Sequence, residues 1–281
     1  GTPHIVSAHS LEPLRPWKAE QLGGGYQISS WAEKTSYEAA AAIIAVSDGM
    51  RADVLAAYPS VDPKKVVTIR NGVDTSKFAP NNNPAVLQEF GITGRYAMFV
   101  GRITRQKGLA HLLRAWKSVP AEYGLVLAAG SPDEETVGNE VAALIAELQA
   151  TRSNVWWIKE MLPHDKLTAA LTQADLFLCP SIYEPLGIVN LEAMGCETAV
   201  LASRVGGIPE VVSHQETGIL VDYTSDHSRF EADLAAAISE LMADPARLEK
   251  YGKAGRLRAQ THFGWDAVAA QTISLYRSVI S

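Results

Sequence analysis

The sequence has few cysteines and no long apolar run, and each shortage excludes a class of protein. Two cysteines, Cys179 and Cys196, among 281 residues form neither a disulfide framework nor a zinc site, so reduced thiols in a cytoplasmic protein are expected. No stretch approaches about 18 unbroken apolar residues, so no transmembrane helix is expected. The opening GTPHIVSAHS lacks the basic and apolar regions of a signal peptide.

Positive charge is also scarce. The chain has 25 Lys and Arg residues against 31 Asp and Glu residues, a formal net charge of −6. This balance argues against an electrostatic nucleic-acid binder, although it is compatible with a local basic pocket for a small anion. Hydrophobic residues make up 47% of the chain, enough for a substantial core, and the length suits one large domain or two small ones.

Short apolar runs alternate with longer amphipathic stretches, which predicts repeated βα units and a parallel sheet. Strands are expected at His4–Ala8, Ile43–Val46, Val66–Ile69, Tyr96–Val100, Leu125–Ala129, Val155–Ile158, Leu176–Cys179, Ala199–Ala202 and Gly218–Val221. Helices are expected at Ser30–Ala41, Asp48–Ala57, Ala110–Val119, Glu134–Gln149, Lys166–Thr172, Gly187–Met194, Arg229–Met242, Pro245–Thr261 and Asp266–Val279. Asp133 and Asp165 are expected to cap the helices that follow them. The glycine-rich segment Gln21–Tyr26 is expected to form a flexible loop.

One break in composition divides the chain into two parts. The Asn- and Pro-rich segment APNNNPAV, residues 79–86, is typical of a linker. The strands after it are enough for a complete doubly wound domain, whereas the strands before it are fewer than an independent domain needs. We therefore expect a partial first domain over residues 1–80, a complete second domain over 84–262 and a closing helix over 263–281. Roughly 100 residues of the first domain are expected to be missing from this chain.

The first motif with candidate ligand-binding residues is FVGRITRQKG, which begins at the end of an expected strand and ends at Gly108. In a doubly wound domain, ligands bind beyond the carboxyl ends of the strands. Arg102, Arg105 and Lys107 would lie there, and guanidinium and ammonium groups bind phosphate well. The Gly-Lys-Ser/Thr ending of a Walker loop is absent. A solvated basic turn is the alternative interpretation.

The second motif is SIYEPLGIVNLEAMGC, which also follows an expected strand. The first amides of its helix, at Gly187, Ile188 and Val189, would form an anion site. Glu192 lies further along that helix, and a carboxylate can accept hydrogen bonds from both hydroxyls of a ribose. Glu184, in the loop, could bind sugar hydroxyls or stabilise positive charge on a glycosyl carbon. The alternative is two ordinary surface glutamates, which the surrounding Pro, Leu, Gly and Ile residues disfavour.

Together with IRNGVDTSKF, VGGIPE and TGILV, these motifs resemble retaining glycosyltransferases of the GT-B fold, family GT4. The opening AHSLEPLRPWKAEQLGGGY is similar to bacterial glycogen synthases of the actinobacterial type, whose close relatives make maltose-1-phosphate. The resemblance implies a complete C-terminal Rossmann-like domain and the C-terminal part of an N-terminal one. It implies a hexosyltransferase that moves glucose from ADP-glucose or UDP-glucose to an α-1,4-glucan end or to glucose-1-phosphate, in glycogen biosynthesis.

The resemblance also implies roles for single residues. Arg102 and Lys107 would bind the donor diphosphate, Glu192 the ribose, and Glu184 the transferred sugar. His9 would lie near the anomeric carbon and would join Arg102, Lys107 and Glu184 as a catalytic residue. The rest of the nucleotide-sugar site would comprise Gly101, Met161, Leu162, Leu186, Gly187, Ile188 and Val189. Candidates for binding the acceptor are Arg15, Trp17 and Lys18.

The family's reaction is expected to occur on one face of the sugar, with the leaving phosphate oxygen taking the acceptor's proton. No metal or other cofactor is implied, and no nucleic acid. Three alternatives stay open at this point. The chain could be a nucleotide-sugar-binding fragment without turnover, or a GT4 transferase with another sugar or acceptor. It could also be a sugar-nucleotide 2-epimerase, against which the glutamate pair and the GRITRQKG loop argue.

Overall fold

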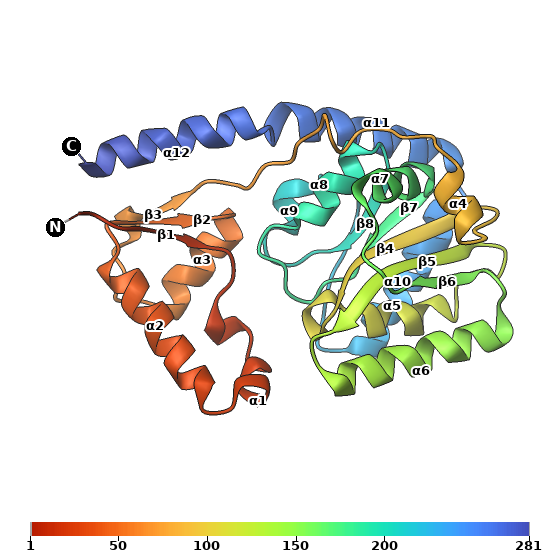
Figure 1. Cartoon of the computed structure of the whole chain (residues 1–281), viewed down its shortest axis with the longest axis horizontal. Helices are drawn as coiled ribbons and strands as arrows, with labels where there is room; N and C mark the ends of the chain where they lie inside the picture. The colour runs from red at the N-terminus through yellow and green to blue at the C-terminus, as the bar shows by residue number, and fades with distance from the viewer. Residues whose placement is uncertain (1, 281) are drawn as a thin grey trace. The chain divides into compact units, whose positions relative to one another are not determined.

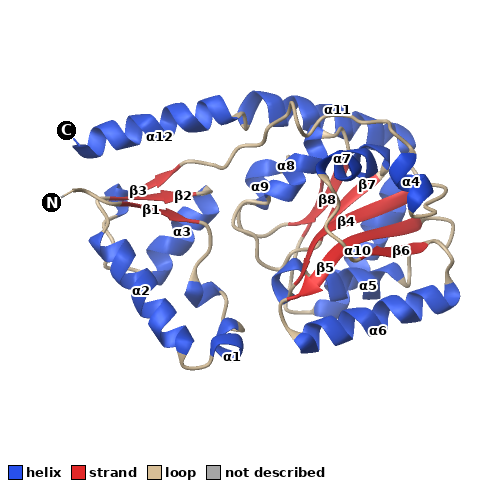
Figure 2. Cartoon of the chain, viewed as in Figure 1, coloured by secondary structure: helices blue, strands red, loops and turns tan. Residues whose placement is uncertain are grey.

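The computed structural model of the chain describes residues 2–280 and shows an α/β fold with two parallel sheets (Figures 1 and 2). The described residues divide into two compact units. Unit 1 runs up to Gly72 and resumes at Trp265, and unit 2 spans Val73–Gly264. The α/β class expected from the sequence is therefore confirmed. Within the described residues, no helix is long and apolar enough to cross a lipid bilayer.

Unit 1 is built on a three-stranded parallel sheet in the order β1–β2–β3. Its strands are β1 (Ile5–Ala8), β2 (Ala42–Ala45) and β3 (Val66–Thr68). The central strand reads AIIA and is buried throughout, as parallel strands covered on both faces are. The helices of unit 1 are η1 (Glu12–Leu14), α1 (Lys18–Leu22), α2 (Gly25–Ala39), α3 (Asp48–Ala57), η2 (Pro63–Lys65) and α12 (Trp265–Ile280).

The last helix, α12, belongs to unit 1, and none of its described residues is fully buried. Tyr276 and Ile280 line one hollow together with Ile5, and Leu275 lines another together with Ile69. The end of the chain therefore belongs to the same compact unit as its beginning.

The prediction of a flexible loop over Gln21–Tyr26 is wrong, because most of this segment is helical. Helix α1 covers its start, and α2 begins at Gly25. Gly23 ends α1 with a φ of +51°, a conformation that residues with a Cβ rarely adopt. The Tyr26 hydroxyl then donates a hydrogen bond to the backbone oxygen of Glu12 at 2.9 Å, which fixes the start of α2.

Unit 2 is built on a six-stranded parallel sheet in the order β6–β5–β4–β7–β8–β9. Its strands are β4 (Tyr96–Ile103), β5 (Gly124–Pro132), β6 (Val155–Ile158), β7 (Leu176–Cys179), β8 (Ala199–Ser203) and β9 (Gly218–Val221). The chain moves outward from β4 to β6 and then crosses back to β7, which lies beside β4. Such a reversal is a topological switch point, where open α/β sheets bind their ligands.

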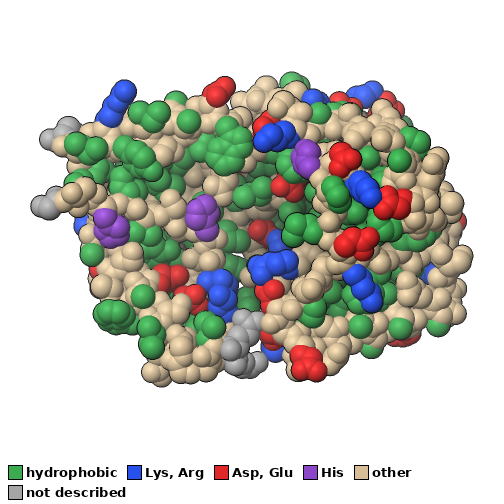
Figure 3. Space-filling model, in the orientation of Figure 1, with side chains coloured by type: hydrophobic (Ala, Val, Ile, Leu, Met, Phe, Trp, Pro, Cys, Tyr) green, Lys and Arg blue, Asp and Glu red, His purple; other side chains and the backbone are tan. Residues whose placement is uncertain are grey.

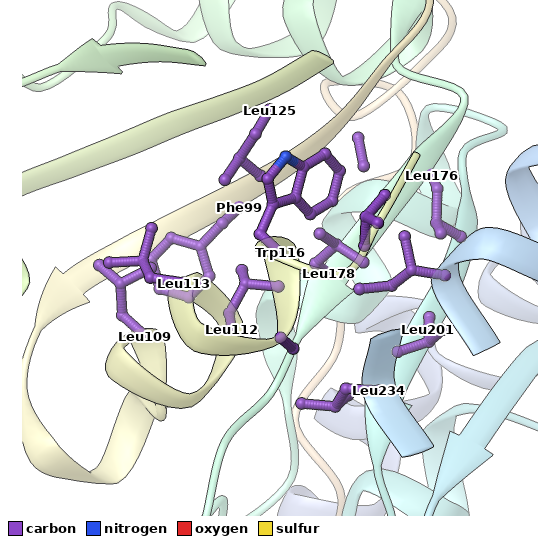
Figure 4. Close-up of a cluster of buried hydrophobic side chains, with 14 of the residues drawn as sticks. Phe99, Leu109, Leu112, Leu113, Trp116, Leu125, Leu176, Leu178, Leu201 and Leu234 are labelled. Carbon is purple, nitrogen blue, oxygen red and sulfur yellow. The ribbon is translucent and has the colours of Figure 1, made fainter. Parts of the chain in front are cut away.

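Helices cover both faces of this sheet, with α5, α6 and α10 on one side and α7 and α8 on the other (Figure 1). The helices of unit 2 are α4 (Ala85–Glu89), η3 (Arg105–Lys107), α5 (Leu109–Trp116), α6 (Glu135–Thr151), α7 (His164–Gln173), α8 (Ile188–Gly195), α9 (Ile208–Val211), α10 (His227–Met242) and α11 (Pro245–His262). Trp116, the last residue of α5, is fully buried among apolar side chains that include Leu125 and Leu178 (Figure 4). Cys179 and Cys196 are buried free thiols.

The expected strands are all present, and β6, β7 and β9 have the predicted limits. Periodicity missed the short elements α1, α4, α9 and the 3₁₀ helices, because one turn gives too little of a repeat. The expected caps are wrong: the residue before α6 is Glu134 and the residue before α7 is Pro163. Asp133 instead pairs with an arginine of the neighbouring loop.

The Asn- and Pro-rich segment at residues 79–86 is anchored to unit 2 rather than free. The Asn81 backbone N–H donates to the Thr172 hydroxyl at 2.9 Å, and its side-chain amide donates to the Asp165 carbonyl at 3.0 Å. These bonds attach the segment to α7. The compact units divide the chain earlier, between Gly72 and Val73.

Candidate active site

The candidate site lies at the carboxyl ends of the neighbouring strands β4, β7 and β8. The chain leaves β4 into η3, leaves β7 into the loop of Ser181 and Glu184, and leaves β8 into a turn at Gly206. Because these strands are adjacent and parallel, their following loops meet at one edge of the sheet. The two motifs singled out in the sequence are therefore brought together.

An ion pair between Lys107 and Glu184 occupies this edge. The Lys107 Nζ lies 2.6 Å from the Glu184 Oε2, and the two side chains are only 15% and 12% exposed. The Ser181 hydroxyl donates a hydrogen bond to the same oxygen at 3.2 Å. Burial by itself lowers the pKa of Lys107, but the Glu184 carboxylate more than offsets this, and the net pKa is raised. Lys107 is therefore a cation at neutral pH. Since a buried ion pair contributes little net stability, its place at the switch point indicates a functional role.

A close backbone contact holds the loop of Lys107 against the loop of Glu184. Gly108 has a φ of +64°, and a Cβ added there would lie 2.0 Å from the Pro180 carbonyl oxygen. The Ile182 N–H donates to the Gln106 carbonyl at 2.9 Å. Only glycine permits this approach, which fixes the spacing of the two charged residues before any ligand binds.

A third loop holds the backbone of Glu184 itself. Gly206 has a φ of +51°, and a Cβ added there would lie 2.0 Å from the Glu184 carbonyl oxygen. The Gly207 N–H donates to that same oxygen at 3.0 Å. The VGGIPE segment thus acts on the site through the position of Glu184.

Helix α8 begins directly after the loop of Glu184 and carries Glu192. Gly187 precedes the helix with a φ of +97°, and α8 begins at Ile188, four residues after Glu184. Burial raises the pKa of Glu192 to about 7, and only the charge of Lys107 opposes that effect. Glu192 is thus a half-buried carboxylate whose burial disfavours the ionised form. This is expected of a group that accepts hydrogen bonds from a ligand.

A cavity of about 560 Å³ adjoins the end of β4. Its lining includes Gly101, Arg102, Met161 and Leu162 from the set expected in the sequence. Leu162 is buried, whereas Met161 is 94% exposed. The size of this cavity and its mixed polar and apolar lining suit a flat, partly apolar ligand group.

Arg102 borders this cavity but is bound to a neighbour. Its Nη1 lies 2.7 Å from the Asp133 Oδ2, and the side chain is 65% exposed. Arg105 makes a similar pair with Glu134 at 3.1 Å. Figure 3 shows basic and acidic side chains interspersed over the face of the molecule in view, so the cations on that face do not gather in a broad basic surface.

The remaining expected residues fall into two groups. The first group surrounds the start of α8, as the second motif predicted: Leu186 and Gly187 precede the helix, Ile188 and Val189 begin it, and Glu192 lies further along it. His9, Arg15, Trp17 and Lys18 all belong to unit 1, in and beyond the loop that follows β1.

The site also includes Ser181, Gly206 and Asp133, which were not predicted from the sequence. A signal was present for the glycine, since paired glycines after a strand mark a close approach. None was present for Asp133, because its pairing with Arg102 depends on how two distant loops meet.

Solved structures that share this architecture are GT-B glycosyltransferases. Sucrose-phosphate synthase from Thermosynechococcus elongatus matches with a TM-score of 0.81 and 29% identity, covering 98% of this chain and 67% of that one. HepE from Anabaena matches with a TM-score of 0.82 and 20% identity, covering 98% and 72%. Fold and site thus define a glycosyltransferase of the GT-B type.

The chain belongs to the glycosyl transferases group 1, within glycosyltransferase family 4. The model of the first family matches residues 88–258, and that of the second matches residues 1–77. The alpha-maltose-1-phosphate synthase of Mycolicibacterium smegmatis is 53% identical over 99% of this chain and 74% of its own length. The D-inositol 3-phosphate glycosyltransferase of Segniliparus rotundus is 33% identical over 100% of this chain and 62% of its own length. The expected family and the expected class of enzyme, a hexosyltransferase, are confirmed.

Proposed function

We propose that this chain transfers glucose from a nucleotide sugar, ADP-glucose or UDP-glucose, to glucose-1-phosphate, with retention of the α configuration. The observation that carries the donor half is the buried Lys107–Glu184 pair, together with Glu192 on α8, whose pKa is raised by burial to about 7. The acceptor half is supported by the 53% identity to an alpha-maltose-1-phosphate synthase. Maltose-1-phosphate contains two glucose units and one phosphate, which corresponds to glucose added to glucose-1-phosphate.

Each part of the donor has a matching group in unit 2. The cavity beside Met161 and Leu162 suits the nucleobase. Glu192 can accept hydrogen bonds from the ribose hydroxyls, which would relieve the cost of its burial. Lys107 and the first amides of α8 would bind the diphosphate, because a helix N-terminus and an ammonium both favour negative charge. Arg102 would leave Asp133 to join them.

The proposed chemistry follows from how Glu184 is held. Its carboxylate is tied to Lys107 and Ser181, which makes it a poor nucleophile and suits it to bind sugar hydroxyls. The bond between the anomeric carbon and the phosphate oxygen breaks, and the bond to the acceptor oxygen forms on the same face. The acceptor's proton passes to the departing phosphate oxygen. Lys107 stabilises the charge that develops on that diphosphate.

Acceptor binding is assigned to unit 1, with Arg15 and Lys18 as the cations for the phosphate and Trp17 as a surface for the sugar ring. His9 is assigned to the transferred sugar, as the family resemblance implies. An α-1,4-glucan end in glycogen biosynthesis is the alternative acceptor, and the absence of a phosphate on it provides the discriminating test.

The test is a panel of donors and acceptors. The chain is incubated with radiolabelled ADP-glucose or UDP-glucose, together with glucose-1-phosphate or a maltooligosaccharide. A labelled disaccharide phosphate is the expected product. Labelled oligosaccharide alone would replace the proposed acceptor with a glucan. Binding of ADP or UDP without any transfer would show a nucleotide-sugar-binding fragment instead.

A further inference from the structure

A second charged cluster lies in unit 1, in the loop that follows β1. Glu12 begins η1, and its side chain is only 8% exposed. Its Oε1 accepts a hydrogen bond from the Arg15 Nη2 at 3.0 Å and another from the Ser29 hydroxyl at 3.1 Å. Burying a carboxylate is costly unless it is paired and hydrogen-bonded. The loop is therefore organised around this acid.

The backbone of Glu12 is held on both sides. The Glu33 carboxylate accepts the Glu12 N–H at 2.9 and 3.2 Å, and the Tyr26 hydroxyl donates to the Glu12 carbonyl at 2.9 Å. The Tyr58 hydroxyl donates in turn to Glu33. Burial raises the pKa of Glu33, against the opposing effect of these two hydrogen bonds. Because Glu12 is fixed in this way, the position of the guanidinium that it binds is fixed too.

The cluster leaves hydrogen-bonding capacity unused. Among the residues that the structure describes, the Nε of Arg15 and the Oε2 of Glu12 are buried without a hydrogen-bond partner. Buried polar groups without partners are rare in native proteins, and each needs an explanation. A guanidinium carries five N–H donors in a rigid plane that suits bidentate binding of phosphate. Arg15 uses its Nη2 to bind Glu12, and its Nε is enclosed by the protein. The side chain remains 14% exposed, so an anion would reach the guanidinium at its exposed edge.

We propose that Glu12 is a positioning residue, which holds the Arg15 guanidinium in the orientation that binds the phosphate of the acceptor. This inference rests on the proposed function, which supplies a sugar phosphate as acceptor. Glu12 itself touches neither substrate. Without the Glu12 carboxylate, Arg15 keeps its charge, but its guanidinium is no longer held in one orientation. Acceptor binding therefore weakens, while the donor site in unit 2 is unchanged.

The test compares Glu12→Gln with the unmodified chain. Glutamine keeps the size of the side chain and can still accept from Ser29, but it loses the ionic bond to Arg15. The dissociation constant and the KM for glucose-1-phosphate should rise about tenfold, the loss expected for one hydrogen bond between charged groups. The kcat at saturating acceptor and the dissociation constant for ADP-glucose should change less than about twofold. Glu38→Gln, the same change at a more exposed position of α2, serves as the matched control.

A double substitution separates positioning from a merely structural role. In an Arg15→Gln background, Glu12→Gln should have no further effect on glucose-1-phosphate binding, since Glu12 acts through Arg15. Additive effects, or a parallel loss of ADP-glucose binding, overturn the inference. If Glu12→Gln does not fold, Ser29→Ala tests the same point. It removes the other bond to this carboxylate and should raise the same dissociation constant about twofold to threefold; an unchanged constant overturns the inference.

Failure of this inference is distinguishable from failure of the proposed function. A wild-type chain that neither binds nor uses glucose-1-phosphate contradicts the proposed acceptor and the inference with it. A wild-type chain that binds it, with unchanged affinity in Glu12→Gln, overturns the role of Glu12 alone.

Discussion

Lys107 and Glu192 lie in one site, and their surroundings shift their proton affinities for different reasons. The Glu184 carboxylate keeps Lys107 charged in spite of its burial. Glu192 has no comparable partner, so burial raises its pKa to about 7. The sequence predicted both residues as ligands. It could not predict these shifts, because they depend on burial and on which charges become neighbours after folding.

Donor binding should depend on pH through Glu192. Its folded-state pKa, about 7, lies above its usual 4.5, so its contribution to stability is complete below about pH 4.5 and is lost as the pH rises through 7. A ribose that donates to the carboxylate reverses this preference. ADP-glucose affinity should therefore rise roughly tenfold from about pH 6 to pH 8. Calorimetric titration at the two pH values tests this, with Glu192→Gln as the variant that loses the dependence. The same slope in that variant would contradict the assignment.

The charged pair should be essential for turnover. Lys107→Ala removes the cation that stabilises the leaving diphosphate, and Glu184→Ala removes the proposed sugar contact. Each should lower kcat by on the order of 10²-fold or more, as the loss of one such contact does. Arg105→Ala, which removes another cation of η3, should stay within about twofold of wild type. Wild-type rates for either charged-pair variant would refute the assigned role, and an equal loss for Arg105→Ala would show that any change to η3 is harmful.

At the scale of elements, the periodic strands and helices could be predicted, and the contacts between their loops could not. The strand over Val155–Ile158 has its predicted limits, since a short apolar run between polar segments is a local signal. Gly206, by contrast, reads only as a turn in the sequence. That its Cα faces the Glu184 carbonyl follows from the order of β7 and β8 in the sheet, which a single sequence does not reveal.

Gly206→Ala should displace Glu184 without removing any charged side chain of the site. The new Cβ would meet the Glu184 carbonyl oxygen at 2.0 Å, so the loop that carries Glu184 must shift. A displacement on the order of 1 Å typically costs about 10²-fold in rate, and a comparable fall in kcat is expected. Gly91→Ala is the matched control, because Gly91 also has a positive φ, +63°, but open space around it. Steady-state kinetics of both variants separate the clash from backbone strain. Equal effects would show that strain alone is responsible.

At the scale of the whole molecule, composition and patterning predicted the α/β class and the parallel sheets, and the motifs predicted the family. The division into compact units could not be placed from composition alone. The segment at residues 79–86 looked like a linker because Asn and Pro disfavour regular structure, yet Asn81 uses its polar groups to bind α7. Local composition shows that a segment is irregular, and only tertiary contacts show whether it is anchored.

The core of unit 2 should depend on Trp116. This side chain is fully buried between α5 and the sheet (Figure 4), so Trp116→Ala leaves a large cavity. The free energy of unfolding should fall by about 3–5 kcal/mol. Urea denaturation followed by circular dichroism measures this, with Trp31→Ala as control, since Trp31 is 67% exposed. A loss below about 1 kcal/mol for Trp116→Ala would contradict the described core.

The proposed function requires that the cluster of Lys107, Glu184 and Glu192 binds a nucleotide sugar and promotes transfer of its glucose to a sugar phosphate. The most direct measurement is proton and phosphorus NMR of the chain with ADP-glucose or UDP-glucose and glucose-1-phosphate, repeated with Lys107→Ala. We expect a disaccharide phosphate with a new α linkage and release of the nucleoside diphosphate, and at least about 10²-fold slower formation in the variant. A β linkage, transfer that Lys107→Ala does not slow, or nucleotide binding with no disaccharide phosphate would contradict the proposed function.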